Sequence, residues 1–93
     1  MVNKLQTARG LALSTLGEIF QDGAFSNIAL KKALGKATLS EVDKSLVTEI
    51  VYGTVSRKLT LEWYLSHFVA DRDQVDPWIY HLLLMSLYQF VYL

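Results

Sequence analysis

Residues 78–93, WIYHLLLMSLYQFVYL, form the stretch on which the fold of this chain depends. Thirteen of its sixteen residues are aliphatic, aromatic or methionine, and it contains neither glycine nor proline. At about 100° per residue the stretch predicts a helix with His81, Ser86 and Gln89 on one half. The other half is wholly apolar and consists of Ile79, Leu83, Leu84, Leu87, Phe90 and Val91. Such a helix needs neighbours on nearly every side, so we expect the other segments to pack around it.

The end of the chain has no residue that would cap or break this helix, because it finishes on Tyr92 and Leu93. We therefore expect a truncated piece of a longer protein, in which further segments cover the helix. An isolated piece that exposes a large apolar face tends to self-associate. This predicts a homodimer.

Length and composition narrow the class of protein. The 93 residues suit one domain, residues 1–93. The hydrophobic content of 52% excludes a disordered chain, and the absence of net charge excludes a generic polybasic arm. The charge is uneven, since residues 1–36 hold five basic and two acidic side chains and residues 37–93 hold four and seven. The absence of cysteine favours a cytoplasmic protein and excludes thiolate chemistry. The apolar C-terminal run is shorter than the roughly 20 residues of a membrane-spanning helix, so we expect no membrane partner.

The positions of the capping and helix-ending residues predict five helices with short connections and no strand, which is an all-α fold. The predicted N-caps are Asn3 (with Gln6), Ser26, Ser40 (with Asp43), Thr60 and Asp76 (before Pro77). Gly23 and Gly35 are expected to end the first two helices. Periodicity places the following residues on the inward faces of the first four helices: in the first, Leu5, Ala8, Ala12, Leu16, Ile19 and Phe20; in the second, Ile28, Leu30, Ala33 and Leu34; in the third, Val42, Leu46, Ile50 and Gly53; in the fourth, Leu61, Tyr64, Leu65 and Phe68. Phe25, which precedes the second helix, is expected to pack on Leu30 as a hydrophobic staple.

The third predicted helix carries the most specific packing signals. Gly53 in its middle suggests that another backbone crosses closely, and the last helix is the natural candidate. Asp43, Glu49 and Arg57 flank the same inner face, where an unpaired charge is costly. We therefore expect a partly buried ion pair there, for which Arg9 is a second possible cation.

Two surface patterns on the first two helices are open to more than one interpretation. Gly10, Ser14 and Gly17 form a stripe of small residues, which close approach of another element or a weak exposed face would each explain. Lys31, Lys32 and Lys36 form a basic cluster, which is either a solvated face or a phosphate contact.

Motifs for catalysis, cofactors or metals do not occur in the sequence. The five glycines are scattered singly, so neither GxGxxG nor GxxxxGK[ST] is present. His67 and His81, the two histidines, lie outside any HExxH pattern, and there is no GxSxG. We therefore predict no catalytic, cofactor-binding or metal-binding residue in this segment.

Three segments together resemble a known family: DKSLVTEIVYGTVSR at 43–57, LTLEWYL at 59–65 and LLLMSLYQFVYL at 82–93. They are similar to the NusB-like N-terminal domain of the RsmB (Sun, Fmu) family of ribosomal RNA small-subunit cytosine-C5 methyltransferases. RGLA at 9–12 and FSNIAL at 25–30 fit the same pattern, so the resemblance covers essentially the whole chain. Ser86, where many relatives have glycine, and Ser56, where a hydrophobic residue is usual, depart from it.

The resemblance implies an incomplete NusB-like antiparallel helical bundle that precedes a Rossmann-like domain. In the family that second domain binds S-adenosylmethionine and methylates carbon 5 of a cytosine with the help of cysteines. This chain has no cysteine, so the parent protein is the expected enzyme and S-adenosylmethionine the expected cofactor of the missing domain.

The leading functional hypothesis is an auxiliary domain that helps to position small-subunit ribosomal RNA. Its expected partners are that RNA, through phosphate contacts of Lys4, Arg9, Arg57 and Lys58, and its own C-terminal catalytic domain. Stand-alone NusB proteins bind RNA through an arginine-rich N-terminus, whereas only Lys4 and Arg9 occupy that region here. The alternatives are a stand-alone transcription antitermination adaptor and a helical interaction domain that binds no RNA.

Overall fold

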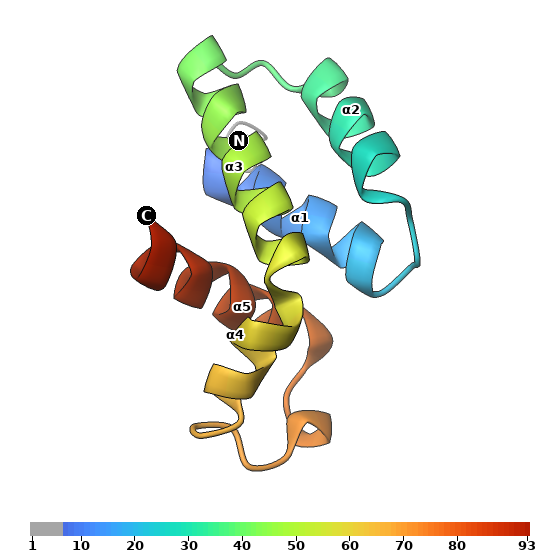
Figure 1. The fold of residues 1–93 in the computed structure, drawn as a ribbon. Helices are drawn as coiled ribbons and strands as arrows, with labels where there is room; N and C mark the ends of the chain where they lie inside the picture. The colour runs from blue at the N-terminus through green and yellow to red at the C-terminus, as the bar shows by residue number, and fades with distance from the viewer. Residues whose placement is uncertain (1–6) are drawn as a thin grey trace.

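The computed structural model describes residues 7–93, which form five α-helices, one 3-10 turn and no strand (Figure 1). The elements are α1 (Ala8–Phe20), α2 (Ser26–Lys36), α3 (Glu41–Ser56), α4 (Lys58–Leu65), the 3-10 turn η2 (Arg72–Gln74) and α5 (Pro77–Tyr92). The predicted all-α class and the five helices are confirmed.

The starts of α1, α3 and α5 show which capping signals operate. Thr7 is the N-cap of α1, and its Oγ1 accepts a hydrogen bond from the Gly10 backbone N–H at 3.0 Å. The predicted capping pair of Asn3 and Gln6 lies outside the described residues. The Ser40 cap of α3 is confirmed, because its Oγ accepts from the Asp43 N–H at 3.2 Å. Asp76 and Pro77 take the predicted cap and first helical positions of α5, although the Asp76 side chain makes no capping bond.

The predicted caps of α2 and α4 were wrong. Phe25 is the N-cap of α2, so Ser26 is already helical, and the helix runs through Gly35 to Lys36. Gly23, in contrast, follows the end of α1 with φ 77°, a left-handed conformation that suits glycine. The chain changes direction at Arg57, which separates α3 from α4, and Thr60 lies inside α4. Residues 58 and 59 have good helix propensity, so the helix begins before the threonine that could have capped it.

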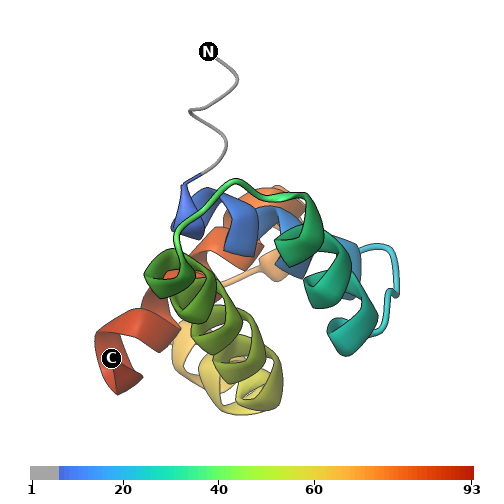
Figure 2. The ribbon, with the colours of Figure 1, turned by 90° about the horizontal axis from the view of Figure 1, so that it is seen from above.

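The helices enclose two hydrophobic cores. The larger core contains residues of α1, α2 and α3 together with Met85 of α5, and the smaller one contains Leu61, Leu65, Tyr80, Leu84 and Tyr88 of α4 and α5. Helix α5 packs against α1, α3 and α4, whereas α2 packs on α1 and α3 (Figures 1 and 2). Helix α5 therefore contributes to both cores, which agrees with the prediction that the other segments pack around it.

Helix α5 is buried along one face and not on nearly every side. The buried residues are Tyr80, His81, Leu84, Met85 and Tyr88, whereas Phe90, on the predicted apolar half, is 88% exposed. Both halves of this helix carry large apolar residues, and the buried face includes His81 from the half that holds the polar residues, so periodicity did not identify it. The hydroxyls of Tyr80 and Tyr88 both find carboxylate acceptors when buried, which favours the observed face.

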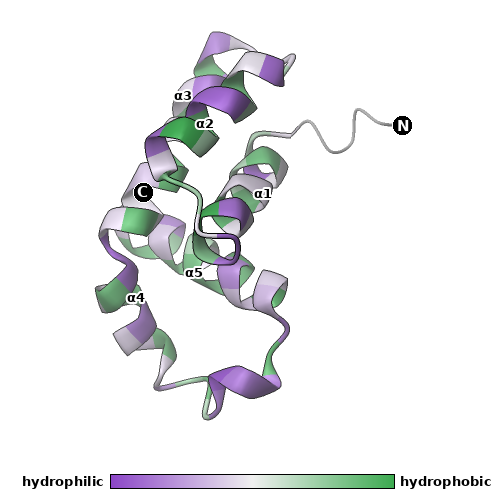
Figure 3. Ribbon diagram, turned by 90° about the vertical axis from the view of Figure 1, so that its right-hand side faces the viewer, coloured by the Kyte–Doolittle hydropathy of each residue, from purple (hydrophilic) through white to green (hydrophobic). Residues whose placement is uncertain are grey.

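Several other predicted inward residues are exposed. These are Phe25 and Ile28 of the α2 region, Val42 of α3, and Tyr64 and Phe68 at α4. Figure 3 shows hydrophobic residues on α4 and α5 and the hydrophilic character of η2. Among residues 7–93, none of the helices combines the length and apolarity that a membrane crossing requires.

Candidate nucleic-acid interface

The predicted phosphate-binding residues lie at three different positions in the chain. Arg9 is in the first turn of α1, Arg57 is the residue between α3 and α4, and Lys58 begins α4. Lys4 lies outside the described residues.

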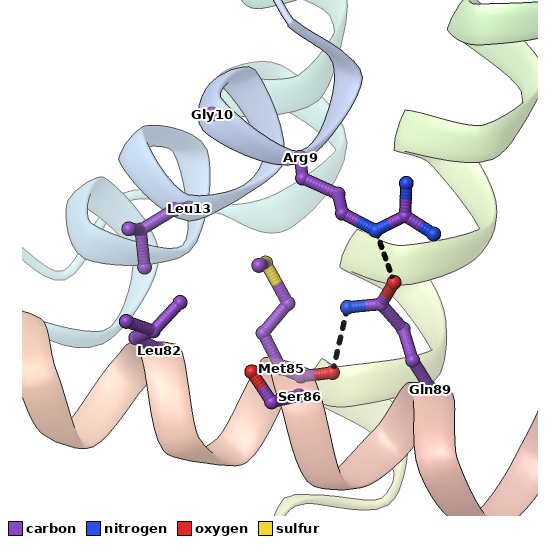
Figure 4. Close-up of a pocket in the computed structure, with 7 residues that line it drawn as sticks. All are labelled: Arg9, Gly10, Leu13, Leu82, Met85, Ser86 and Gln89. Atoms are coloured by element: carbon purple, nitrogen blue, oxygen red, sulfur yellow. Dashed lines mark hydrogen bonds between the residues drawn. The ribbon is translucent and has the colours of Figure 1, made fainter.

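Arg9 reaches across to the last helix. Its Nε donates a hydrogen bond to Oε1 of Gln89 at 2.6 Å, and Nε2 of Gln89 donates to the Met85 carbonyl at 3.2 Å (Figure 4). The two contacts hold the guanidinium at the edge of an open groove of about 480 Å³ between α1 and α5, which Leu13 and Leu82 also line. Arg9 itself is exposed, so its remaining N–H groups can reach an anion.

Arg57 also rests on α5. Its guanidinium carbon lies 4.3 Å from the centroid of the Tyr92 ring, which is a cation–π contact. The Tyr92 ring stacks on Tyr88, with 5.4 Å between centroids and 28° between planes. A row of side chains therefore runs from the buried Tyr88 to the exposed guanidinium.

The structure brings two of the predicted cations to the same end of the molecule and separates a third. Gln89 and Tyr92, the contacts of Arg9 and Arg57, are neighbours at i and i+3 on α5. Lys58 points elsewhere, because its Nζ lies 5.1 Å from the ring centroid of Phe20 at the far end of α1. The interface that the geometry supports is thus centred on the C-terminal turn of α5.

The predicted ion pair of Asp43 or Glu49 with Arg57 or Arg9 was wrong. Among residues 7–93 the Glu49 carboxylate forms no ion pair, and its Oε2 accepts a hydrogen bond from the Tyr88 hydroxyl at 2.6 Å. Burial raises the pKa of Tyr88, and the hydrogen bond to Glu49 raises it further. Glu49 is exposed, so solvent stabilises its charge and no cation is needed beside it.

Gly53 makes room for this tyrosine. A Cβ atom at position 53 would overlap the ring and the hydroxyl of Tyr88. The predicted close approach of the last helix is confirmed, but the Tyr88 side chain fills the space where a crossing backbone was expected.

The partly buried ion pair forms in the other half of the molecule. Arg72 of η2 donates through Nη1 to Oε2 of Glu62 at 2.9 Å, and its guanidinium carbon lies 4.3 Å from the Tyr80 ring centroid. The Tyr80 hydroxyl donates to the same carboxylate at 3.4 Å. Burial and then the charge of Glu62 raise the pKa of Tyr80. The sequence offered no sign of this pair, because Arg72 lies in an acidic loop without helical periodicity.

His81 is a core residue. It is buried on α5, with its ring centroid 5.5 Å from that of Phe20. Burial lowers the pKa of His81, and the charges of Arg72 and Lys58 lower it further, so the neutral form is favoured. No group of three His, Cys, Asp or Glu side chains that could hold a metal ion occurs within residues 7–93.

The two open surface patterns are now partly resolved. The Lys31, Lys32 and Lys36 side chains are exposed, and Lys32 pairs with Glu18 at 3.2 Å. Nothing lies within 4 Å of a Cβ built at Gly17, so close approach does not explain that glycine.

The sequence did not point to the aromatic residues and the glutamine beside Arg9 and Arg57. Tyr88, Gln89 and Tyr92 were recognisable only as parts of the predicted last helix and of the segment at 82–93 that resembles the family. An arginine at the start of one helix and an aromatic residue in the last turn of another become neighbours only through the packing of α5.

Comparison with known proteins identifies the family. The model of the NusB family matches residues 6–93. A Bacillus subtilis (strain 168) protein named "Probable ribosomal RNA small subunit methyltransferase B" is 39% identical over 90 residues, which is 97% of this chain. A Synechocystis sp. protein of the same name is 34% identical over 89 residues, which is 94% of this chain.

The alignments cover only part of these relatives, since the chain spans 20% of the length of each. No solved structure matches the chain significantly. The resemblance inferred from residues 43–57, 59–65 and 82–93 is confirmed, and the match over residues 6–93 shows that this chain belongs to the NusB family.

Proposed function

We propose that this chain is the N-terminal RNA-binding domain of a ribosomal RNA small-subunit cytosine-C5 methyltransferase. In this proposal it positions the RNA for a catalytic domain that binds S-adenosylmethionine. The observation that carries the proposal is the 39% identity, over 97% of the chain, to a protein whose name states this kind of activity.

The positions of Arg9 and Arg57 support an RNA-binding role. Both guanidinium groups lie at the C-terminal end of α5, and both residues are exposed. Arginine binds phosphate oxygens with a planar set of donors, and such contacts position an RNA without reading its sequence. Lys4 and Lys58 are further candidates, and Lys58 would make a separate phosphate contact, because it lies beside Phe20 at the end of α1.

Exposed apolar side chains on α4 and α5, and just after each of these helices, support the second expected partner, the catalytic domain. Trp63, Phe68, Phe90 and Leu93 are all at least half exposed. In this proposal the catalytic domain covers part of this surface and leaves the Arg9 and Arg57 side chains open to RNA.

The test is RNA affinity measured as a function of salt concentration. The double variant Arg9→Ala/Arg57→Ala should bind a small-subunit ribosomal RNA fragment more weakly, with the slope of log K against log[salt] reduced by about 0.7–0.9 for each lost phosphate contact. Lys44→Ala is the control, because it removes a charge near the start of α3 that belongs neither to the predicted phosphate contacts nor to the basic cluster of α2. An unchanged affinity and slope in the double variant would contradict the proposal.

One observation favours a second candidate function, a helical interaction domain that binds no RNA. Both arginines already have partners within the chain, Gln89 and Tyr92. The variants Arg9→Ala and Arg9→Lys together separate the two functions, because only lysine keeps the charge, while both lose the Nε donor that Gln89 accepts from. RNA binding predicts that Arg9→Ala weakens the RNA affinity and that Arg9→Lys retains most of it. A purely structural role predicts lower thermal stability and unchanged RNA affinity in both variants.

A further inference from the structure

The outward face of α3 carries a second, more polar groove next to Arg57. It has a volume of about 280 Å³, and its lining includes Thr48, Glu49, Tyr52, Ser56, Arg57 and Tyr88. Glu49 and Arg57 lie two helical turns apart, about 12 Å along the axis of α3. The groove thus has a carboxylate toward one end and a guanidinium at the other.

The hydroxyl groups of this groove are arranged as acceptors. The Thr48 hydroxyl donates its proton to the Lys44 carbonyl at 2.9 Å, and the Ser56 hydroxyl donates to the Tyr52 carbonyl at 2.8 Å. Both oxygens therefore keep only lone pairs for a ligand. Glu49 is also an acceptor, and Tyr88 occupies only one of its two oxygens. A ligand that fits this groove presents N–H donors to Glu49 and negative charge to Arg57.

The aromatic side chains supply a flat surface. The Tyr52 ring is 43% exposed and available for stacking, whereas the Tyr88 ring, which also lines the groove, is buried with Tyr92 stacked on it. Aromatic rings and arginine guanidinium planes are the groups on which proteins stack unpaired RNA bases. Stacking surface, acceptors and a cation are thus combined within one groove.

We propose that this groove binds a single unpaired nucleotide whose base carries an exocyclic amino group. The base stacks on Tyr52, its amino group donates to Glu49, and its phosphate contacts Arg57. Cytosine, adenine and guanine carry such an amino group, whereas uracil does not, so the groove disfavours uracil. The inference rests on the proposed RNA-binding function and adds a base preference that phosphate contacts alone cannot produce.

The experiment compares two single-stranded probes of equal length, oligocytidine and oligouridine, by fluorescence anisotropy with the 93-residue chain. We expect oligocytidine to bind at least about fivefold more tightly, the effect of a lost hydrogen bond to a charged acceptor. Glu49→Gln should abolish this preference. The amide oxygen still accepts from the Tyr88 hydroxyl, but the amide NH2 replaces the second carboxylate oxygen, so the amino group of the base loses its acceptor.

A second variant tests stacking without disturbing the core. Tyr52→Ala should weaken binding of both probes by at least about fivefold. Tyr64→Ala is the matched control, since Tyr64 is exposed to a similar extent, 40%, but lies on α4 outside this groove. Thermal unfolding verifies that each variant is folded.

The outcomes distinguish this inference from the proposed function. If the chain binds a small-subunit ribosomal RNA fragment in a manner sensitive to Arg9→Ala/Arg57→Ala, but binds both probes equally or not at all, the groove inference is overturned and the proposed function stands. Unchanged binding in Tyr52→Ala overturns it as well. If the chain binds neither the fragment nor the probes, both are overturned.

Discussion

At the scale of single residues, the contact between Gly53 and Tyr88 links α3 to α5. The absence of a side chain at position 53 leaves room for the Tyr88 ring. The Tyr88 hydroxyl donates a hydrogen bond to Glu49, which lies one turn before Gly53 on α3. Tyr88 is almost fully buried and also carries the stacked Tyr92 and, through it, Arg57. The position of Arg57 in the candidate interface therefore depends on residue 53.

Gly53→Ala is expected to lower the free energy of unfolding. The new methyl group would collide with Tyr88, and overpacking of this kind costs about 1–3 kcal/mol, which exceeds or equals the gain of about 1 kcal/mol from alanine's helix propensity. Urea unfolding measures the difference. Gly17→Ala is the control, because nothing lies within 4 Å of its new Cβ atom, and it should stabilise the chain by up to about 1 kcal/mol. Equal stabilisation by both substitutions would show that Tyr88 does not restrict position 53.

At the scale of elements, the start of α3 determines how this helix enters the larger core. Ser40 has an extended backbone and accepts a hydrogen bond from the Asp43 N–H, and Glu41 and Asp43 place negative charge in the first turn, where the helix dipole favours it. The helix then buries Val47, Ile50 and Val51 in the larger core. Local chemistry and packing agree here, which is why the sequence predicted this start.

Ser40→Ala should lower stability by about 1 kcal/mol, because it removes the acceptor for an unpaired N–H group at the start of the helix. For a chain of this size the midpoint of thermal unfolding should fall by about 4–8 °C. Ser45→Ala, an exposed serine inside the same helix, should leave the midpoint unchanged or raise it slightly. A similar decrease in both variants would mean that the cap does not stabilise α3.

At the scale of the whole molecule, α5 connects both cores and still exposes part of its apolar surface. Phe90, Val91 and Leu93 are exposed at its end, near the guanidinium groups of Arg9 and Arg57. Exposed apolar side chains beside fixed cations are typical of surfaces that bind other macromolecules. The proposed RNA and domain contacts therefore meet at the end of this one helix.

We expect the isolated chain to form a homodimer through this surface, because dimerisation would remove these side chains from water. Light scattering at several concentrations should give a mass that approaches twice that of the monomer. Phe90→Ser should shift the equilibrium toward the monomer, whereas Val42→Ser, a similarly exposed change at the start of α3, should not. A monodisperse monomer at all concentrations would contradict the prediction.

The sequence by itself determined the helical class, the number of helices, the Ser40 and Asp76 starts and the family, because these depend on local spacing and on residue identity. Periodicity also selected the core residues Leu16, Ile50 and Leu61. It also indicated, through Gly53, that α5 approaches α3 closely.

Only the tertiary structure decided which face of α5 is buried and where the charged side chains find partners. Glu49 bonds to Tyr88, Arg72 pairs with Glu62, and Arg9 and Arg57 meet at one end of α5 while Lys58 lies apart. Contacts of this kind join residues far apart in the chain, and they depend on the rotation of each helix about its axis. A helix that is apolar on most sides, such as α5, leaves that rotation undetermined until the helices pack together.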